Sequence, residues 1–393
     1  MKWERKSIGD VCYVGDGAHA SIQRQPDGFQ YLSSKNFKLD GLDLSKVDFI
    51  SEVDYQKHFK DESKAITKPK FNDVLLSIIG SLGAPYLVKQ DDIFGLSSSV
   101  SILRPNNELI DPKFLYYWIK SNEFQSSINN IKSGVAQSFL SLGMIKSLPV
   151  IFPNELPTQR KIASILSAYD DLIENNLKRI KLLEEKAFVT YKLLMNSEKL
   201  IEGKSGDLAD VKSGFAFKGT DWTDEGYPVI KIKNIGNNDI DLKDCSLIPE
   251  NIAEAAAKFK LNAGDLLIAM TGATVGKIGM MPRTETSFYL NQRVGVFKPK
   301  VANAELFLFC FYNESFAKDA IQSLASGAAQ PNISGGQIES IKLFYPKLEI
   351  VSKFGYSIKN HFELIWNLKQ QNAKLREARD ILLPRLMNGQ IEV

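Results

Sequence analysis

The chain has 393 residues, of which 44% are hydrophobic and 24% charged, a length and composition that suit two folded domains rather than one core or a disordered chain. Lysine and arginine number 49 against 46 acidic residues, and the net charge of +3 excludes a histone-like polycation but not a local basic face. Three scattered cysteines and three scattered histidines predict a reducing, cytoplasmic setting and no metal site. No apolar run approaches about 18 residues and none follows the charged N-terminus, so we expect neither a membrane span nor a signal peptide.

Residues 1–157 are predicted to form a first globular domain of mixed strands and helices. Short β-like runs at 73–79 and 100–103 are bounded by Gly, Pro and Asn turns, and the pattern at 112–119 predicts a helix. Residues 158–200 predict one long helix, which we expect Thr158 to cap and Gly203 to stop.

Residues 201–346 are predicted to form a second globular domain of the same kind. The β-like runs lie at 227–232, 265–270 and 294–297, and a helix is predicted at 304–312. Residues 347–393 predict a second long helix.

Both long helices carry seam residues spaced alternately by four and three, the a and d positions of a coiled coil. In the first helix these are Ile162, Leu166, Tyr169, Ile173, Asn176, Ile180, Leu183, Ala187, Thr190 and Leu194. In the second they are Val351, Phe354, Ile358, His361, Ile365, Leu368, Asn372, Leu375, Arg379 and Leu382. We expect an antiparallel, pseudo-two-fold pair about 60 Å long. The alternative is two amphipathic helices, each packed on its own domain.

The chain repeats itself with an offset close to 193 residues. The matched segments, in chain order, are Gly9–Val11 with Gly206–Leu208, Lys35–Asn36 with Lys233–Asn234, Asp73–Leu76 with Asp265–Ile268, Val100–Pro105 with Val294–Pro299, Ser133–Gln137 with Ser326–Gln330, and Pro153 with Pro346. Six matches in one order predict a duplication. The expected fold class is α+β, with two repeated domains joined by two long antiparallel coiled-coil helices.

No catalytic constellation is found in the sequence. The string at 271–278 resembles a phosphate-binding loop, but Thr271 replaces the first glycine and Ile278 the magnesium-binding hydroxyl. The acid pairs Asp170–Asp171 and Glu184–Glu185 are expected on the solvated outer face of the first long helix. We therefore predict a protein that is not an enzyme. A duplicated module on a rigid spacer suits DNA instead, because a duplex offers equivalent grooves about 34 Å apart.

Several strings resemble the specificity (S) subunits of type I restriction–modification systems. The domain exit at 153–166 is similar to the family's proline–Glu–Gln start of a helix, and a weaker match follows Pro346. The helix ends at 193–195 and 383–389, the Ser-Gly-x-Ala-Gln loops and Asp16–His19 also resemble family strings.

The resemblance implies a non-catalytic subunit whose two target recognition domains each read one half of a split site in double-stranded DNA. It implies that the long helices set the spacing and dock two methyltransferase (M) subunits, and that motor-nuclease (restriction, R) subunits join the assembly. S-adenosylmethionine is expected on the methyltransferase subunits and no cofactor on this chain. The alternative function is a symmetric coiled-coil scaffold that joins two protein clients without binding DNA.

Candidate DNA-binding residues follow from the chemistry of phosphates and base edges. Phosphates attract lysine, small hydroxyls and Gly-rich loops, which nominates Lys35, Asn36, Ser133, Gly134, Gln137, Ser138, Lys231, Lys233, Asn234, Ser326, Gly327, Gln330 and Asn332. Their alternative role is a scaffold turn shared by both repeats. Base readers should differ between the repeats, which nominates Ser98 and Ser99, aligned with Gln292 and Arg293, together with His19. The alternatives are surface residues that have drifted and an ordinary loop histidine.

Overall fold

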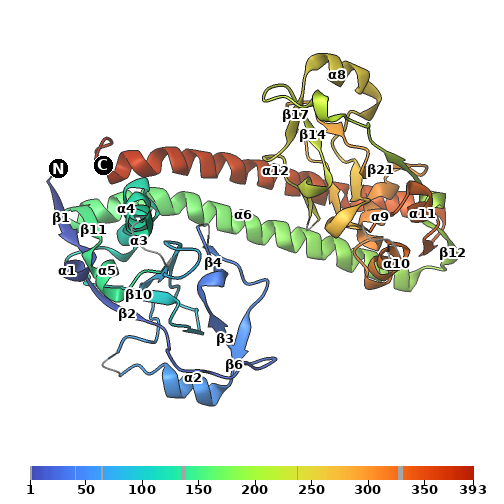
Figure 1. Cartoon of the computed structure of the whole chain (residues 1–393). Helices are drawn as coiled ribbons and strands as arrows, with labels where there is room; N and C mark the ends of the chain where they lie inside the picture. The colour runs from blue at the N-terminus through green and yellow to red at the C-terminus, as the bar shows by residue number, and fades with distance from the viewer. Residues whose placement is uncertain (1, 40, 63–64, 134–138, 237, 326–330) are drawn as a thin grey trace. The chain divides into compact units, whose positions relative to one another are not determined.

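The duplication in the sequence reappears as two sets of secondary-structure elements in the same order (Figure 1). A computed structural model describes residues 2–39, 41–62, 65–133, 139–236, 238–325 and 331–393. Unit 1 comprises residues 1–174 and 372–393, and unit 2 comprises residues 175–371. The sequence-based division at residues 157, 200 and 346 follows chain order, whereas these units group residues by packing.

The named strands of unit 1 all lie between residues 3 and 153. In chain order its elements are β1 (Trp3–Ser7), α1 (Ile8–Val11), β2 (Cys12–Asp16), β3 (Phe29–Leu32), η1 (Ser34–Asn36), β4 (Phe37–Lys38), β5 (Gly41–Leu42), β6 (Asp48–Ile50), α2 (Glu52–His58), β7 (Val74–Ser77), β8 (Pro85–Leu87), β9 (Phe94–Leu96), β10 (Val100–Pro105), α3 (Pro112–Lys120), α4 (Asn122–Ser133), α5 (Leu142–Ser147) and β11 (Pro149–Pro153). The long helix α6 (Leu156–Ser197) follows and continues into unit 2.

Unit 2 repeats this order. Its elements are β12 (Ile201–Lys204), α7 (Ser205–Leu208), β13 (Ala209–Ser213), η2 (Gly219–Asp221), β14 (Tyr227–Ile230), η3 (Ile232–Asn234), β15 (Ile235–Gly236), β16 (Asp239–Ile240), β17 (Ser246–Ile248), α8 (Glu250–Ala255), η4 (Ala257–Phe259), β18 (Leu266–Ala269), η5 (Gly272–Thr274), β19 (Ile278–Met280), β20 (Tyr289–Leu290), β21 (Val294–Pro299), α9 (Ala304–Phe311), α10 (Ser315–Ala325), α11 (Gly335–Glu339) and β22 (Lys342–Tyr345). The second long helix, α12 (Leu348–Met387), returns to unit 1.

Every sheet of unit 1 has a counterpart in unit 2. The four-stranded sheet β2-β10-β7-β8 corresponds to β13-β21-β18-β19, and both are antiparallel. The three-stranded sheet β6-β3-β9 corresponds to β17-β14-β20, and in each the central strand pairs in parallel with the later one. The mixed α/β fold class and its duplication are therefore confirmed.

Strands β7 and β18 are apolar except at Ser77 because each face of the sheet covers a different core. In β7, Val74 and Leu76 join the core of the helices, whereas Leu75 joins the core under the three-stranded sheet. Strand β18 divides Leu266 and Leu267 in the same way. Successive strand residues point to opposite faces, so a strand buried on both sides is an unbroken hydrophobic run. The predicted runs at 73–79 and 265–270 are confirmed.

The predicted helical seams are buried or half-buried within each unit. In unit 1 the amide of Asn372 donates to the Ile173 carbonyl at 3.4 Å, so these segments of α12 and α6 meet at the polar seam residue Asn372. In unit 2 the Tyr191 and Phe354 rings lie 6.0 Å apart. Within each unit the two helix segments run antiparallel, as predicted.

The start of α6 differs from the prediction. The helix begins at Leu156, so Thr158 lies in its first turn and donates its N–H to the Glu155 carbonyl instead of capping the helix. The buried Gln159 fixes this start: its side chain accepts from the Asp111 N–H at 2.8 Å and donates to the Pro153 carbonyl at 2.8 Å. This glutamine is therefore a structural residue of the domain exit.

Two further predictions about α6 are wrong. The helix ends at Ser197 and Gly203 lies in strand β12, paired with Leu343, because the backbone has already turned into the two-stranded sheet. Asp170 is not a solvated surface residue, because it accepts a hydrogen bond from Tyr117 and forms an ion pair with Arg379.

Candidate nucleic-acid interface

The turn between β9 and β10 in unit 1 is equivalent to the turn between β20 and β21 in unit 2, because individual backbone hydrogen bonds of the two turns correspond. The Ser99 carbonyl accepts from the Ile78 N–H at 3.0 Å, and the Arg293 carbonyl accepts from the Met270 N–H at 3.0 Å. Ser99 and Arg293 therefore occupy one position of the repeat.

The preceding residues, Ser98 and Gln292, are equivalent in the same way. The Ser98 N–H donates to the Ala18 carbonyl at 3.2 Å, and the Gln292 N–H donates to the Phe215 carbonyl at 2.9 Å. The backbone of this turn is thus held identically in both units, while the side chains it presents differ.

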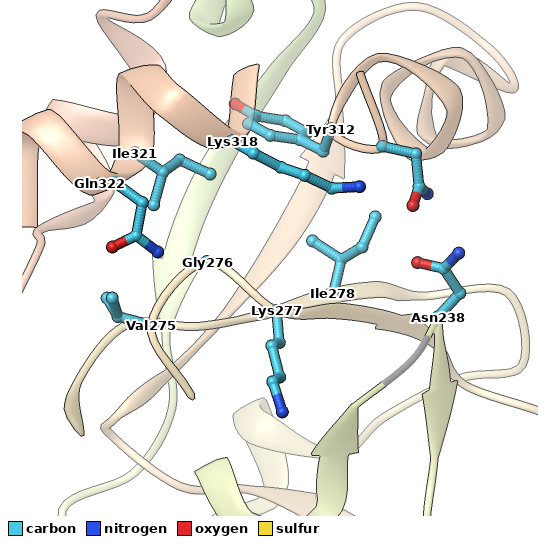
Figure 2. Close-up of a pocket in the computed structure, with 10 residues that line it drawn as sticks. Asn238, Val275, Gly276, Lys277, Ile278, Tyr312, Lys318, Ile321 and Gln322 are labelled. Carbon is cyan, nitrogen blue, oxygen red and sulfur yellow. The ribbon is translucent and has the colours of Figure 1, made fainter. Parts of the chain in front are cut away.

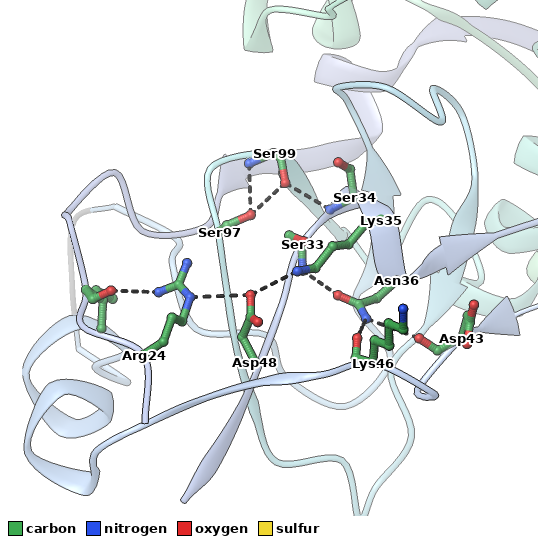
Figure 3. A network of polar contacts seen from close by, with 11 residues as sticks. Arg24, Ser33, Ser34, Lys35, Asn36, Asp43, Lys46, Asp48, Ser97 and Ser99 are labelled. Atoms are coloured by element: carbon green, nitrogen blue, oxygen red, sulfur yellow. Dashed lines mark hydrogen bonds and ion pairs between the residues drawn. The ribbon is translucent and has the colours of Figure 1, made fainter. Parts of the chain in front are cut away.

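The side chains of the two turns make different contacts, and Figure 3 shows those of unit 1. In unit 1 the Ser99 hydroxyl accepts from the Ser34 N–H at 2.9 Å and lies 2.6 Å from the Ser97 hydroxyl, so it belongs to the turn itself. In unit 2 the side chains of Gln292 and Arg293 are exposed, and Arg293 has no ion pair among the residues that the structure describes. Unit 2 therefore presents a guanidinium where unit 1 presents an engaged hydroxyl.

Asn36 and Asn234 are buried inside the loops that follow β3 and β14. The Asn36 side chain accepts from the Ser33 N–H at 3.1 Å and donates to the Asp43 and Lys46 carbonyls at 3.1 and 2.9 Å (Figure 3). Asn234 makes the three equivalent bonds in its own loop, each at 3.0 Å. Both amides close a loop, and this placement favours the scaffold role over phosphate contact for this pair.

Lys35 is exposed and shares a carboxylate with a second cation. Its ammonium lies 3.1 Å from Asp48, and the Arg24 guanidinium lies 3.4 Å from the same oxygen (Figure 3). Arg24 also stacks 4.1 Å over the Tyr31 ring. Two cations on one carboxylate leave an excess positive charge on this surface.

Unit 2 carries its own basic cluster. Lys233 pairs with the exposed Asp244 at 2.8 Å, whereas Lys231 donates to the Ser246 hydroxyl at 2.8 Å and lies 3.3 Å over the Trp222 ring. Burial, and then the charge of Lys233, lower the pKa of Lys231. Sequence reasoning missed Arg24 and Trp222, although basic residues near aromatic ones are a known sign of nucleic-acid binding.

The residues that follow the two Gly-rich segments form matching bridges in the two units. In unit 1, α4 ends at Ser133, and Phe139 bridges to Ile79. In unit 2 the exposed Asn332 bridges to Thr271 at the matching turn. The nominated residues Gly134, Gln137, Ser138, Ser326, Gly327 and Gln330 lie outside the described residues.

His19 follows Ala18, whose carbonyl accepts from Ser98 in the turn between β9 and β10. Its imidazole is exposed, and its Nε2 lies 2.7 Å from an Asp16 carboxylate oxygen. A neutral ring must donate from Nε2 in this contact, which leaves Nδ1 as an acceptor.

In each unit the segments described above are far apart in the sequence but meet at one edge of the unit, which we call the loop edge. In unit 1 the Ser34 N–H reaches Ser99, and in unit 2 the Thr274 hydroxyl donates to the Ile232 carbonyl at 3.4 Å. The loop edge of unit 1 comprises residues 18–19, 33–36, 79–83 and 97–99, and that of unit 2 comprises residues 231–234, 271–276 and 291–293. Of the nominated residues that the structure describes, His19, Lys35, Asn36, Ser98 and Ser99 lie on the loop edge of unit 1, and Lys231, Lys233, Asn234, Gln292 and Arg293 lie on that of unit 2. Asn332 bridges to this second edge at Thr271, whereas Ser133 lies at the end of α4, outside the loop edge. Among the described residues no group of His, Cys, Asp and Glu could hold a metal ion.

The protein is a duplication of one α/β unit, and each unit packs on segments of the two long helices. Each unit has an equivalent loop edge, so the protein presents two related surfaces. Residues 1–185 and 198–377 match the family described as type I restriction modification DNA specificity domain. The chain therefore belongs to this family, the specificity subunits of type I restriction–modification systems.

Curated relatives and a solved structure agree with this assignment. The chain is 25% identical over 415 residues to the type I restriction enzyme MjaVIII specificity subunit of Methanocaldococcus jannaschii, covering 100% of this chain and 93% of the relative. It is 21% identical over 471 residues to the HindI specificity subunit of Haemophilus influenzae, covering 99% of each. A crystal structure of the type I system S subunit from M. genitalium matches with a TM-score of 0.61 at 18% identity, covering 98% of this chain and 96% of that one, which shows the fold.

The family assignment confirms the resemblance seen in the sequence. Specificity subunits are the non-catalytic components of type I systems, in agreement with the prediction that this chain is not an enzyme. Their function involves DNA and assembly with other restriction–modification subunits. No helix in the described ranges is both long and apolar enough to cross a membrane.

Proposed function

We propose that this chain reads a bipartite DNA target, with the loop edge of each unit contacting one half-site. The observation that carries the proposal is the correspondence between the two loop edges: equivalent hydrogen bonds hold the backbone positions, whereas the side chains at those positions differ. A retained frame with variable exposed residues is what two readers of different half-sites require.

The chemistry of each loop edge supports two kinds of DNA contact. Exposed lysines such as Lys35 and Lys233 supply charge for phosphates, a contact that does not depend on sequence. The exposed Arg293 supplies a planar fork of donors that matches the two acceptors of guanine in the major groove, and the neighbouring Gln292 amide matches adenine. Unit 2 is therefore the half in which we place direct base reading by this turn.

The long helices supply the remaining parts of the proposal. A helix of 42 residues is about 63 Å long, which is enough to hold two readers at least one turn of DNA apart. The outer faces of α6 and α12 then dock two methyltransferase subunits, which carry S-adenosylmethionine, while this chain binds no cofactor. Restriction subunits join that assembly.

The proposal is tested by selecting DNA from a random-sequence duplex library with the complex of this chain and its methyltransferase subunit. We expect the selected molecules to share two short motifs separated by a fixed, unspecified spacer. A variant with Gln292→Ser and Arg293→Ser, which gives unit 2 the residues of unit 1 at this turn, should change one motif and leave the other and the spacer intact.

Two outcomes contradict the proposal. Selection of a single continuous motif would refute bipartite reading. Absence of any DNA retention by the intact complex would favour a scaffold that joins protein clients.

A further inference from the structure

Unit 2 contains a cavity of about 400 Å³ beside its loop edge (Figure 2). One side is formed by the η5–β19 turn and the other by α10 and the end of α9. Val275, Ile278 and Ile321 form apolar walls, and the polar lining includes Asn238 and Lys318. Among the residues that the structure describes, no carboxylate contributes to the lining.

Unit 1 has the same turn at the same place. Gly83 and Gly276 both adopt positive φ, +84° and +81°, and their N–H groups donate to the Ser77 and Ala269 carbonyls at 2.9 Å. A Cβ on Gly83 would meet Ile128 of α4, just as a Cβ on Gly276 would meet Ile321 of α10. The two glycine turns and the two helices are therefore equivalent pairs.

The residue one helical turn before these isoleucines differs between the units. In unit 1 it is Gln125, whose amide donates to the Gly83 carbonyl at 2.9 Å and to the Ile119 carbonyl at 2.8 Å. The glutamine thus ties the turn to α3 across the position of the cavity. In unit 2 it is Lys318, which makes neither of these bonds among the described residues and leaves the gap open.

Lys318 brings an unneutralised charge into this gap. Its side chain is exposed, and it has no ion pair in the part of the chain that the structure describes. Figure 2 shows its ammonium and the Asn238 amide on the same side of the cavity, while the Lys277 side chain extends away from it. An ammonium and an amide over apolar walls, with no carboxylate, suit a tetrahedral anion with a carbon substituent.

We propose that this cavity binds a phosphodiester of the DNA backbone that flanks the half-site read by unit 2. The inference rests on the proposed function and adds to it a contact that unit 1 lacks. Because the η5–β19 turn borders both the loop edge and the cavity, DNA on the loop edge passes close to Lys318. The two units then grip their half-sites unequally.

The test compares Lys318→Gln with the wild type in the intact complex with the methyltransferase subunit. Glutamine is the residue that unit 1 carries at this position, so the variant is expected to fold. The matched control is Lys342→Gln, which removes the same charge from an exposed lysine that pairs with Glu202 and does not line the cavity. The probe is a duplex that carries the selected target, titrated at several salt concentrations.

Lys318→Gln should weaken binding about 3- to 10-fold near 0.1 M salt and reduce the slope of log K against log salt by about 1, since one phosphate contact is lost. Phosphate-ethylation interference should show one backbone position beside one half-site that matters to the wild type and not to the variant. Lys342→Gln should change neither readout.

A wild-type complex that binds its target, with an unchanged slope and ethylation pattern in Lys318→Gln, overturns the phosphate site alone. An equal loss in both variants also overturns it, because the effect is then one of net charge. If the wild-type complex binds no DNA, the proposed function fails and the phosphate site fails with it.

Discussion

Removal of the Asp170 carboxylate tests whether a buried ion pair holds the helical seam of unit 1. The Arg379 guanidinium is 8% exposed and lies 2.5 Å from Asp170, which is 26% exposed and also accepts from the Tyr117 hydroxyl at 2.7 Å. Burial lowers the pKa of Arg379, but the hydrogen bonds and charges of Asp170 and Asp380 outweigh this and raise it. Burial and the charge of Asp170 raise the pKa of Tyr117 above its usual range, so this phenol stays a donor.

The expected cost of Asp170→Ala follows from what is left behind. Removing one partner of a fully buried pair costs about 3–5 kcal/mol, because the remaining charge is uncompensated. Here Arg379 keeps Asp380, 2.8 Å away and 61% exposed, so we expect a smaller cost of about 2–3 kcal/mol. For a unit of this size that corresponds to a fall in Tm of roughly 5–10 °C.

Differential scanning calorimetry of the whole chain measures this fall. The control is Glu185→Ala on the same helix, whose carboxylate is 55% exposed and 3.8 Å from Lys181, where about 0.5 kcal/mol or less is at stake. Replacing the pair by Asp170→Leu with Arg379→Met should restore stability to within about 1–2 kcal/mol of the wild type. Equal effects of Asp170→Ala and Glu185→Ala would refute the reasoning.

Further predictions concern the loop edges and one buried acid. Arg293→Ala should relax base selection in one half-site by about 1–3 kcal/mol, and an unchanged motif in methylome sequencing would exclude a base contact. Lys233→Ala should weaken binding to all sequences alike and lower the salt slope by about 1, whereas a sequence-dependent loss in titrations would point to base reading. Asn234→Ala should destabilise its loop by about 2 kcal/mol, visible as faster limited proteolysis, since three hydrogen bonds disappear. Burial raises the pKa of Glu305, and its Oε2 has no hydrogen-bond partner among the described residues. Folding therefore favours the protonated form of the Glu305 carboxyl. The stability that this protonation contributes to the folded state is fully present below the unfolded pKa of about 4.5 and is lost as the pH rises through the folded pKa. Glu305→Gln should raise stability at pH 7 by about 1 kcal/mol, an advantage that should vanish near pH 4; a pH-independent difference in Tm would contradict this.

The sequence predicted those parts of the fold whose signal is local or periodic. The strand at 266–269 is an unbroken apolar run between turn residues, and the seam of α6 repeats every three and four positions from Ile162 to Leu194. Such patterns survive in the sequence because each residue's environment depends on its own element. Asp170 escaped prediction because it lies next to the seam and is buried by Tyr117, a residue 53 positions earlier in the chain.

The loop edges could be predicted only in part. The sequence nominated Lys35 and Ser99 in unit 1, and Lys233 and Arg293 in unit 2, as separate residues. That the two segments of each unit meet depends on strand pairing between residues far apart in the chain. The same comparison of repeats aligned Asn36 with Asn234, and without the hydrogen bonds it could not separate a loop-closing amide from a phosphate contact. The cavity at Lys318 required knowing what Gln125 spans in the other unit.

Unit 1 is assembled from two stretches of chain, and its core includes Leu383, Leu386 and Met387 beside residues of the first strands. During synthesis the ribosome must therefore add about 200 residues after position 174 before this core can close, which takes roughly 10–40 s at about 5–20 residues per second. Residues 175–371 are all present earlier, so the second half of the gene completes its folding unit first. For that interval the N-terminal half carries an unfinished hydrophobic surface, the kind of surface that makes folding intermediates prone to aggregate.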